Sequence, residues 1–237
     1  MSQNNFLKQS LLRVDVALLI LSVIFFTLIA PRIDISVAGL FYDAQQGGFY
    51  LNNNPLIRAI YNAFAKPHFV ILPALIVLAI TFYRKYKTAD REQDYKNYHK
   101  KWIYSFLLAS LLIGPGLLVN EVLKNNSIGR ARPVEIQEFN GPDTYTAAFE
   151  YSGQCDRNCS FVSGHASMGF YFIALGWLLR SRRAFYIGLG IGIIVGLTRI
   201  VQGGHFLSDT IFAFWVVYFT NLALGKAFKL ENPLNPK

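Results

Sequence analysis

Side chains that bind metal ions are scarce in this sequence. Its 237 residues include only two cysteines, four histidines and 14 acidic residues. A structural zinc site usually takes four Cys or His ligands, so Cys155 and Cys159 do not predict a metal site, and we expect no cofactor. The two cysteines are close together in a segment expected outside the membrane. In an oxidising compartment this favours a disulfide over two free thiols.

Charged residues are also scarce, and apolar residues are abundant instead. Charged residues make up 16% of the chain and hydrophobic residues 53%, whereas a soluble domain has about 45–50% apolar residues. The apolar residues form six runs, at 14–30, 69–83, 102–119, 164–179, 184–197 and 211–224. Because a membrane-spanning helix needs about 20 mostly apolar residues, these runs with their flanking residues predict six transmembrane helices. We therefore predict an all-α fold, a six-helix membrane bundle formed by residues 1–237 as one domain.

Basic residues are distributed unevenly between the predicted loops. The net charge is +9, and if the N-terminus is cytoplasmic, 15 of the 23 lysines and arginines lie on the cytoplasmic side. This asymmetry follows the positive-inside rule, so we expect both termini in the cytoplasm, a cytoplasmic connector at 84–101 and outer segments at 31–67 and 124–163. The charge therefore indicates membrane lipids as partners and not nucleic acid, and we infer no obligate protein partner.

An amphipathic helix is predicted in the first outer segment. Apolar residues recur there at helical spacing, at Leu56, Ile57, Ile60, Tyr61 and Phe64. A helix of this kind lies in the membrane interface. It can form a wall for lipid entry or serve only as a packing element, and the sequence leaves both interpretations open.

Three basic residues remain together on the outer side, at the end of the third predicted helix. They are Lys124, Arg130 and Arg132, with Gly129 and Pro133 beside them. A basic flank at the membrane interface is one explanation. An anion-binding site is the other, because the arginine fork matches a pair of phosphate oxygens and lysine adds a point charge. Since other Lys and Arg residues are sparse on this side, we favour the anion.

A second polar group begins the fourth predicted helix. Ser163, Gly164 and His165 direct backbone N–H groups and a titratable side chain toward the same place. A helix start of this kind is a natural binding site for an anion. The tripeptide is too short to indicate a function by itself.

A third polar group precedes the last apolar run and contains Arg199, His205 and Asp209. Charged residues at membrane depth are costly, and they usually face a bundle interior or a wet cavity. If a helix starts near His205, then His205 and Asp209 share one helical face. The carboxylate can then orient the imidazole and leave the other ring nitrogen free to attack. The alternative is a buried His–Asp pair that only ties helix ends together.

Six membrane crossings bring these three groups to the same outer face. Phosphoryl transfer suits them, because it requires bound phosphate oxygens, an in-line nucleophile and an acid for the leaving group. We expect His205 to attack phosphorus, Asp209 to orient His205, and His165 to protonate the leaving group and then activate water. The groups expected to hold the phosphate are Lys124, Arg132, Arg199, the Ser163 hydroxyl and the Gly164 N–H.

The three stretches resemble the signature motifs of the type 2 phosphatidic acid phosphatase superfamily, which are Lys-x6-Arg-Pro, Pro-Ser-Gly-His and Ser-Arg-x5-His-x3-Asp. The third motif matches with Thr198 in place of Ser, and the second with Val162 in place of Pro. In the first motif, seven residues instead of six separate Lys124 from Arg132, so either the loop bulges by one residue or Arg130 shares the role of phosphate ligand. The resemblance implies a metal-independent lipid phosphatase that acts through a phosphohistidine.

The residues between the motifs are similar to those of bacterial lipid A 4′-phosphatases, notably Gly114-Pro115-Gly116 and the stretches 154–162 and 202–206. The similarity implies a Gram-negative inner-membrane enzyme whose active site faces the periplasm and which removes the 4′-phosphate of lipid A. Enzymes that act on the lipid A 1-phosphate, undecaprenyl pyrophosphate or phosphatidylglycerol phosphate share this chemistry and remain alternatives.

Proteins of another class could carry the same charges. A transporter or an inactive lipid-binding protein lines a path with buried charges. Because His165, His205 and Asp209 are all present, the sequence favours an active enzyme. Vanadate-dependent haloperoxidases share the phosphate-binding motifs, but they are soluble, and the six apolar runs argue against that family.

Overall fold

The computed structural model describes residues 3–65, 68–88 and 102–234. The predicted connector 84–101 lies outside these residues from residue 89 on, and so do residues 66 and 67 of the outer segment 31–67. The described chain is mainly helical, with one short two-stranded hairpin. The N-terminal elements are α1 (Gln3–Ile24), η1 (Phe25–Ile29), α2 (Ile33–Gly39), β1 (Tyr42–Asp43), β2 (Gly48–Phe49), α3 (Pro55–Ala65) and α4 (His68–Thr88).

The second half of the chain builds the bundle. Its first helix is Trp102–Lys124, of which the second part is π-helical. Pro115 lies in this π-helical part, and Asn120 Nδ2 donates to the carbonyl oxygen of Pro115 at 2.7 Å. π-Helical turns within α-helices are frequent at functional sites. The elements from there on are η2 (Leu112–Lys124), η3 (Pro133–Glu135), η4 (Gln137–Phe139), α6 (Gly164–Phe170), η5 (Tyr171–Ile173), α7 (Ala174–Leu179), α8 (Arg182–Val201) and α9 (Leu207–Ala227).

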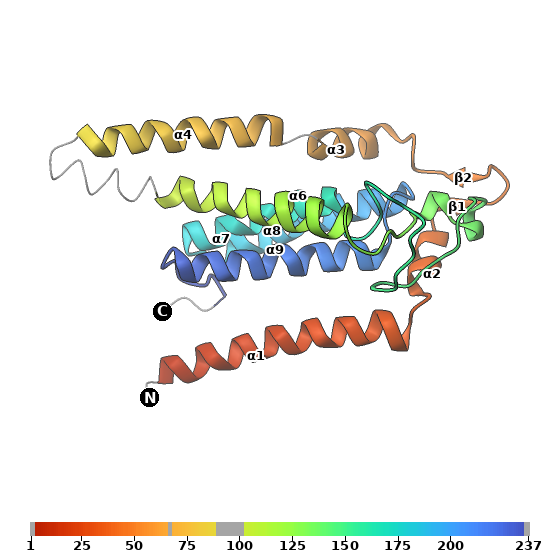
Figure 1. The fold of residues 1–237 in the computed structure, drawn as a ribbon, viewed down its shortest axis with the longest axis horizontal. Helices are drawn as coiled ribbons and strands as arrows, with labels where there is room; N and C mark the ends of the chain where they lie inside the picture. Colours follow the sequence, from red (N-terminus) through yellow and green to blue (C-terminus); the bar gives the residue numbers. More distant parts are fainter. Residues whose placement is uncertain (1–2, 66–67, 89–101, 235–237) are drawn as a thin grey trace.

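Helix α6 lies at the centre of the bundle, where it packs against α8, α9 and η2 (Figure 1). The close approach of α6 and α8 requires glycine, because a Cβ on Gly192 would overlap the ring of Phe170. Membrane helices commonly use small residues in this way. Large apolar side chains fill the core between α7, α8 and α9, among them the buried residues Trp177, Phe185 and Tyr218.

Three described helices are long and apolar enough to cross a membrane: Trp102–Lys124, Arg182–Val201 and Leu207–Ala227. The number is four if Val14–Ile29 and Ile33–Gly39, which are bent by 84°, count as one broken span. The other two predicted spans correspond to shorter apolar helices, Ile71–Thr81 and Gly164–Leu179. The all-α fold is therefore confirmed, but the number of six crossings is not.

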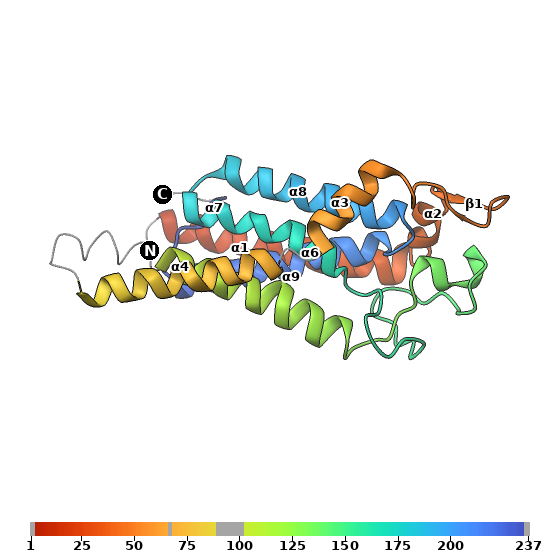
Figure 2. The same ribbon diagram turned by 90° about the horizontal axis from the view of Figure 1, so that it is seen from above.

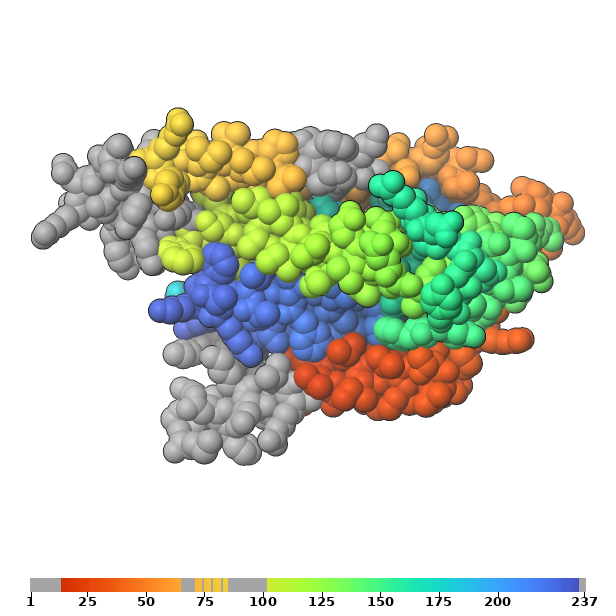
Figure 3. Space-filling model, in the orientation of Figure 1, coloured from red at the N-terminus to blue at the C-terminus, as the bar shows by residue number. Residues whose placement is uncertain are grey.

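The two ends of the bundle differ. Helix α1 begins and α9 ends at one end, whereas α2 and the β1–β2 hairpin lie at the other (Figures 1 and 2). Figure 3 shows the segment 124–163 massed at this second end, which we call the hairpin end. There, Ile136 and Phe139 are buried with Ala38 of α2 and Phe49 of β2. The two predicted outer segments thus pack together at one end of the bundle.

A disulfide closes a small loop at the hairpin end. It joins Cys155 to Cys159, and the N–H of Cys155 donates to the carbonyl oxygen of Gly129 at 3.1 Å. The closed loop contains Asn158, whose carbonyl oxygen accepts from Nη2 of Arg132 at 2.7 Å. The disulfide therefore holds an acceptor for Arg132 in place.

We expect the double variant Cys155→Ser/Cys159→Ser to be less stable than the native protein. Closing so short a loop accounts for about 2 kcal/mol of chain entropy, so the thermal-unfolding midpoint in detergent should fall by several degrees. Dithiothreitol should lower the midpoint of the native protein and leave that of the double variant unchanged. Equal midpoints for native protein and variant would contradict a stabilising disulfide.

Candidate active site

The three polar stretches predicted from the sequence meet at the hairpin end. Helix α8 ends at Val201, and the chain turns through Gly203, whose φ of +66° lies in the left-handed region that favours glycine. Helix α9 begins at Leu207, near His205 as expected, but His205 lies before the helix and so does not share a helical face with Asp209. The extended backbone of Phe206 turns the chain into α9 and still brings the side chains of His205 and Asp209 together.

The imidazole of His205 is fully buried and is held through one of its two nitrogens. Nδ1 lies 2.8 Å from the carbonyl oxygen of Ser160 and 3.5 Å from Oδ2 of Asp209. Because a carbonyl oxygen can only accept, we assign the ring proton to Nδ1. Nε2 then carries the lone pair, and it has no hydrogen-bond partner. An unprotonated nitrogen without a partner is suited to nucleophilic attack.

The pKa of the His205 imidazole is lowered well below its ordinary value of 6.5. Burial is the largest cause, and the positive charges of Lys124, Arg132 and Arg199 lower it further. His205 is therefore neutral at neutral pH, which is the form that can attack an electrophile.

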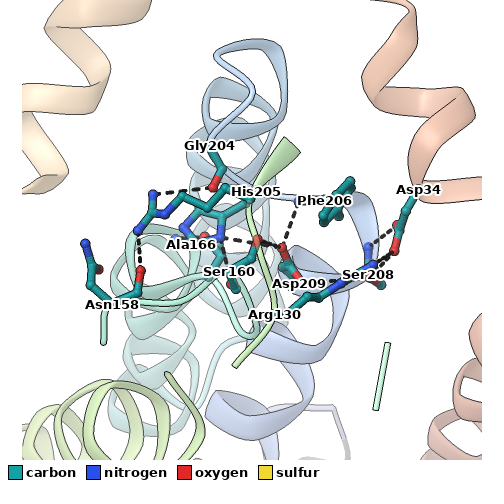
Figure 4. A network of polar contacts seen from close by, with 12 residues as sticks. Asp34, Arg130, Asn158, Ser160, Ala166, Gly204, His205, Phe206, Ser208 and Asp209 are labelled. Carbon is teal, nitrogen blue, oxygen red and sulfur yellow. Dashed lines mark hydrogen bonds and ion pairs between the residues drawn. The ribbon is translucent and has the colours of Figure 1, made fainter. Parts of the chain in front are cut away.

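Asp209 is held through both of its carboxylate oxygens (Figure 4). Oδ2 accepts from the Ser160 hydroxyl at 2.6 Å and from the N–H of Phe206 at 2.8 Å. Oδ1 accepts from Nη1 of Arg130 at 2.8 Å. These bonds leave the carboxylate little freedom to rotate, so its position beside Nδ1 of His205 is well defined.

Arg130, the alternative phosphate ligand of the sequence analysis, has a different role in the structure. Its Nε donates to the carbonyl oxygen of Thr146 at 2.9 Å, and Nη1 and Nη2 each donate at 2.8 Å, to Asp209 and Asp34. The side chain is fully buried, and its guanidinium lies over the ring of Phe206, 4.2 Å from the ring centroid. Because its three nitrogens are engaged in these bonds, Arg130 is not available to a phosphate, and that assignment is corrected.

Arg199 lies at the end of α8 and is 9% exposed. Its guanidinium packs directly on Gly204, where an added Cβ would overlap it. Nη1 donates to Oε1 of Gln202 at 2.5 Å, whereas Nε is buried without a partner. The absence of a side chain at Gly204 is therefore what lets Arg199 lie beside the loop that carries His205.

Lys124 and Arg132 come from the two ends of the first motif. Lys124 is 6% exposed, and its Nζ lies against the start of α6, 3.3 Å from the position of a Cβ on Gly164. Arg132 is half-buried, and its Nη1 donates to the carbonyl oxygen of Gly204 at 3.5 Å. Lys124 therefore lies beside the second motif, and Arg132 lies beside the third motif.

His165 lies in the first turn of α6, and its Nε2 is buried without a partner. Its ring stacks on Tyr61 of α3, with centroids 4.8 Å apart and planes inclined by 23°. Ser163 caps α6, because its hydroxyl accepts from the N–H of Ala166 at 3.3 Å. As an acceptor, this hydroxyl still has its own proton to donate to a ligand. The N–H of Ser163 donates to the carbonyl oxygen of Asp209 at 3.1 Å and ties α6 to α9.

The site is rich in nitrogen atoms that have no partner. Within the described ranges, the buried side-chain nitrogens without a hydrogen bond are Nε2 of His165, Nε2 of His205 and Nε of Arg199. Buried polar atoms normally have a partner, so these three indicate a place for a ligand. Together with Lys124 and Arg132 they suit an oxyanion such as phosphate. No group of three or more His, Cys, Asp or Glu residues in the part that the structure describes could hold a metal ion.

Two residues of the site were not identified from the sequence. Tyr61 was predicted only as an apolar position of an amphipathic helix, but Cζ of Arg199 lies 4.7 Å from its ring centroid, and His165 stacks on it. Helix α3 therefore packs over the site. Asp34 is 1% exposed and pairs with Arg130. An acid so close to the end of an apolar run is a signal that could have identified it.

The contact of Arg199 with Gly204 predicts the effect of a single methyl group. In Gly204→Ala the guanidinium of Arg199 must move, so inorganic phosphate should bind about tenfold more weakly, a loss of about 1.4 kcal/mol. Stability should change little, because the displaced atoms are the far end of a flexible side chain. Isothermal titration calorimetry in detergent measures the binding.

Gly190→Ala is the matched control for this variant. Gly190 lies in α8, and no neighbouring atom lies within 4 Å of an added Cβ. This variant should bind phosphate as the native protein does. If Gly204→Ala also binds phosphate with native affinity, the placement of Arg199 in an anion site is contradicted.

Comparison with known proteins connects this site to a family. Residues 100–229 match the PAP2 superfamily. A lipid A 4′-phosphatase of Francisella tularensis subsp. novicida (strain U112) is 38% identical over 206 residues, which cover 81% of this chain and 88% of that protein. A lipid A 4′-phosphatase of Rhizobium leguminosarum is 31% identical over 217 residues, which cover 83% of this chain and 89% of that protein.

A solved structure has a similar fold. It is a transmembrane PAP2-type phosphatidylglycerolphosphate phosphatase from Bacillus subtilis, with a TM-score of 0.50 over 90% of this chain and 92% of that one. The sequence identity is 17%, so this likeness concerns the fold alone. The matched range 100–229 contains all three motif stretches, from Lys124 to Asp209. The chain belongs to the PAP2 superfamily.

Proposed function

We propose that this protein hydrolyses the 4′-phosphate of lipid A at the periplasmic face of the inner membrane of a Gram-negative bacterium, without a metal ion. The observation that carries the proposal is the pair of unpartnered Nε2 atoms, on His165 and His205, among several cations. Membership of the PAP2 superfamily supports the reaction class, and the two relatives named lipid A 4′-phosphatases support the substrate.

The substrate phosphate is held by charge and by short-range donors. Lys124, Arg132 and Arg199 offset the negative charge of its oxygens, and the Ser163 hydroxyl and the Gly164 N–H donate to them. Because these groups are buried or half-buried, their interactions act in a dielectric lower than that of water. The same groups stabilise the charge that the oxygens carry in the transition state.

In the first step, the lone pair on Nε2 of His205 attacks phosphorus, and the bond from phosphorus to the sugar oxygen breaks. Asp209, beside Nδ1–H, stabilises the positive charge that develops on the ring. The negative charge of the bound phosphate favours the imidazolium form of His165, and this imidazolium donates its proton to the departing oxygen, so that the lipid leaves as an alcohol. The product is a phosphohistidine at residue 205.

In the second step, His165 acts as a base. It takes a proton from water, and the water oxygen attacks phosphorus. The bond between phosphorus and Nε2 of His205 breaks, its electron pair returns to the nitrogen, and inorganic phosphate is released. Both histidines return to their starting states, so the cycle consumes only water and the lipid phosphate.

An apolar cleft supports a lipid as the substrate. It has a volume of about 760 Å³ and lies between α1, η2 and α9. Its lining includes Leu123 and Val162, which directly precede Lys124 and Ser163 in the chain. Burial of acyl chains in such a cleft is favourable. A phosphate at Lys124 with acyl chains in the cleft corresponds to an amphiphilic substrate.

Charge and geometry support a periplasmic site and cytoplasmic termini. The site lies at the hairpin end, and α1 begins and α9 ends at the opposite end (Figure 2). Basic residues are concentrated at that opposite end, including Arg182, Arg183 and Lys226, as the positive-inside rule requires of a cytoplasmic side. The disulfide between Cys155 and Cys159 fits an oxidising compartment at the hairpin end.

Other lipid phosphates share this chemistry. The lipid A 1-phosphate, undecaprenyl pyrophosphate and phosphatidylglycerol phosphate are the alternative substrates. The two relatives that match more than four fifths of this chain are named for the 4′ position, which favours that position. A transporter or an inactive lipid-binding protein is disfavoured, because both histidines present a free nitrogen and Asp209 is in place.

Lipid A extracted from Gram-negative cells that express this protein should lose one phosphate from its disaccharide. Mass spectrometry measures the loss, and fragmentation distinguishes the 4′ from the 1 position. The His205→Ala variant should leave lipid A unchanged. Without Nε2 no phosphohistidine forms, so the rate should fall by about a thousandfold or more.

Several outcomes of this experiment would change the assignment. Immunoblotting of membranes establishes that the native protein and His205→Ala are present in equal amounts. Loss of the 1-phosphate instead of the 4′-phosphate would reject the position of the cut. Unmodified lipid A beside native protein in the membrane would reject lipid A as the substrate. Native activity in His205→Ala would reject His205 as the nucleophile.

The lowered pKa of His205 predicts how kcat/KM, which reports the free enzyme, depends on pH. Because the neutral imidazole attacks, the rate should be maintained down to pH 6.5 and fall only at lower pH, where His205 becomes protonated. Replacing Lys124 by Met removes a positive charge that lowers this pKa. The acid limb of the profile should therefore move to higher pH.

Lys226→Met is the matched control, because Lys226 is exposed in the last turn of α9, far along that helix from Asp209. Ionisation of the substrate affects every variant equally, so the comparison uses the difference between profiles. Coincident acid limbs for Lys124→Met and Lys226→Met would contradict the influence of Lys124 on His205.

A further inference from the structure

Asp34 is a buried acid outside the region that defines the family. It lies in α2, before residues 100–229, and is 1% exposed. Its Oδ2 accepts from Nη2 of Arg130 at 2.8 Å, and its Oδ1 accepts from the N–H of Ser208 at 2.9 Å. The Ser208 hydroxyl also donates to Asp34 (Figure 4). Asp34 thus contacts both the arginine that holds Asp209 and the residue that precedes Asp209 in the chain.

Arg130 connects Asp34 to Asp209. Nη2 of Arg130 lies 2.8 Å from Oδ2 of Asp34, and Nη1 lies 2.8 Å from Oδ1 of Asp209. Both ion pairs are buried. Because a guanidinium is planar and rigid, its orientation against Asp34 determines where Nη1 meets Asp209. Asp209 in turn lies 3.5 Å from Nδ1 of His205. A continuous series of contacts therefore runs from α2 to the imidazole of His205.

The net charge of these groups matters as well as their positions. Both oxygens of Asp34 accept hydrogen bonds, from Arg130 and from Ser208, as the oxygens of an ionised carboxylate do. With Asp34 and Asp209 both ionised, the guanidinium and the two carboxylates carry a net charge of −1. With Asp34 neutral, the net charge would be zero, and Arg130 would offset Asp209 fully. A positively charged ring at His205 would then be stabilised less. A buried arginine that loses one of its two charged partners also loses its fixed orientation.

Asp34 is separate from the groups that hold the phosphate. The hydrogen bonds and ion pairs of Asp34 within the described residues go to Arg130 and Ser208, and none goes to Lys124, Arg132 or Arg199. A change at Asp34 should therefore affect the charge and orientation of Asp209 and leave the binding of phosphate unchanged.

We propose that Asp34 is a positioning residue of the active site, which orients Asp209 through Arg130 and keeps a net negative charge beside His205. The inference rests on the proposed phosphatase reaction, because it assigns Asp34 to the formation and breakdown of the phosphohistidine. It also extends the active site to a residue of α2, which lies outside residues 100–229 that match the PAP2 superfamily. A purely structural Asp34 would instead change the amount of folded protein and leave kcat per folded molecule unchanged.

The test uses Asp34→Asn, which removes the charge and nearly preserves the shape. With purified full-length protein in detergent and a phosphorylated lipid, kcat per folded molecule should fall about tenfold or more, while KM and the Ki of inorganic phosphate stay within about twofold. Asp43→Asn is the matched control. Asp43 is an acid of the same outer segment, and its Oδ1 accepts from the N–H of Gln45 in its own turn, so native values are expected.

A double-mutant cycle tests the route through Arg130. In an Arg130→Gln background, Asp34→Asn should lower kcat by less than it does in the native background, because the connection that orients Asp209 is already broken. If the Asp34→Asn variant does not fold, the kinetic test uses the Arg130→Lys variant instead. Lysine keeps the positive charge but has one nitrogen in place of the planar fork, whose two terminal nitrogens each meet one carboxylate. The orientation of Asp209 is then lost, so the same fall in kcat with an unchanged Ki of phosphate is expected.

The results that would overturn the inference are specific. Native kcat in Asp34→Asn, effects of Asp34→Asn and Arg130→Gln that add fully, or a Ki of phosphate that rises in step with the fall in kcat would each reject it. Release of phosphate by the native protein is measured first. If native protein releases none from any phosphorylated lipid, the proposed function fails, so the two failures are distinguishable.

Discussion

The two buried ion pairs that Arg130 makes, with Asp34 and Asp209, are the interactions on which the hairpin end depends. Charges removed from water are costly unless each one is paired and hydrogen-bonded. That condition is met only when α2, the loop after η2 and the start of α9 are all in place, so the three segments stabilise one another. The same pairs set the carboxylate of Asp209 beside His205, and stability and site geometry therefore have a common origin.

The neighbouring site has the opposite balance of charge. Lys124, Arg132 and Arg199 act on a neutral His205, and the free nitrogens of both imidazoles have no partner in the structure. Cations that repel one another and buried nitrogens without partners raise the free energy of the folded protein. A bound phosphate relieves both effects. Some stability is thus given up for a site whose groups are already arranged for an anion.

The position of the site explains how a lipid can use it. Polar groups gather at the hairpin end, and the apolar cleft between α1, η2 and α9 adjoins them through Leu123 and Val162. In the proposed function, acyl chains stay in these apolar surroundings while a head group reaches Lys124. Helix α3, the predicted amphipathic helix, packs over the site and places Tyr61 against His165 and Arg199. It thus contacts the site directly in addition to its packing against α6 and α8.

Short-range patterns were enough to identify the protein class and to predict the residues that lie together at the candidate site, because apolar runs imply a membrane and each motif holds its chemistry within a few positions. They could not settle the number of crossings, since some apolar runs form shorter helices, or the start of α9, which follows His205. The role of Arg130 required the folded chain. Its partner Asp34 is 96 positions away, and no local pattern specifies which cation of a motif faces a ligand and which is buried between carboxylates.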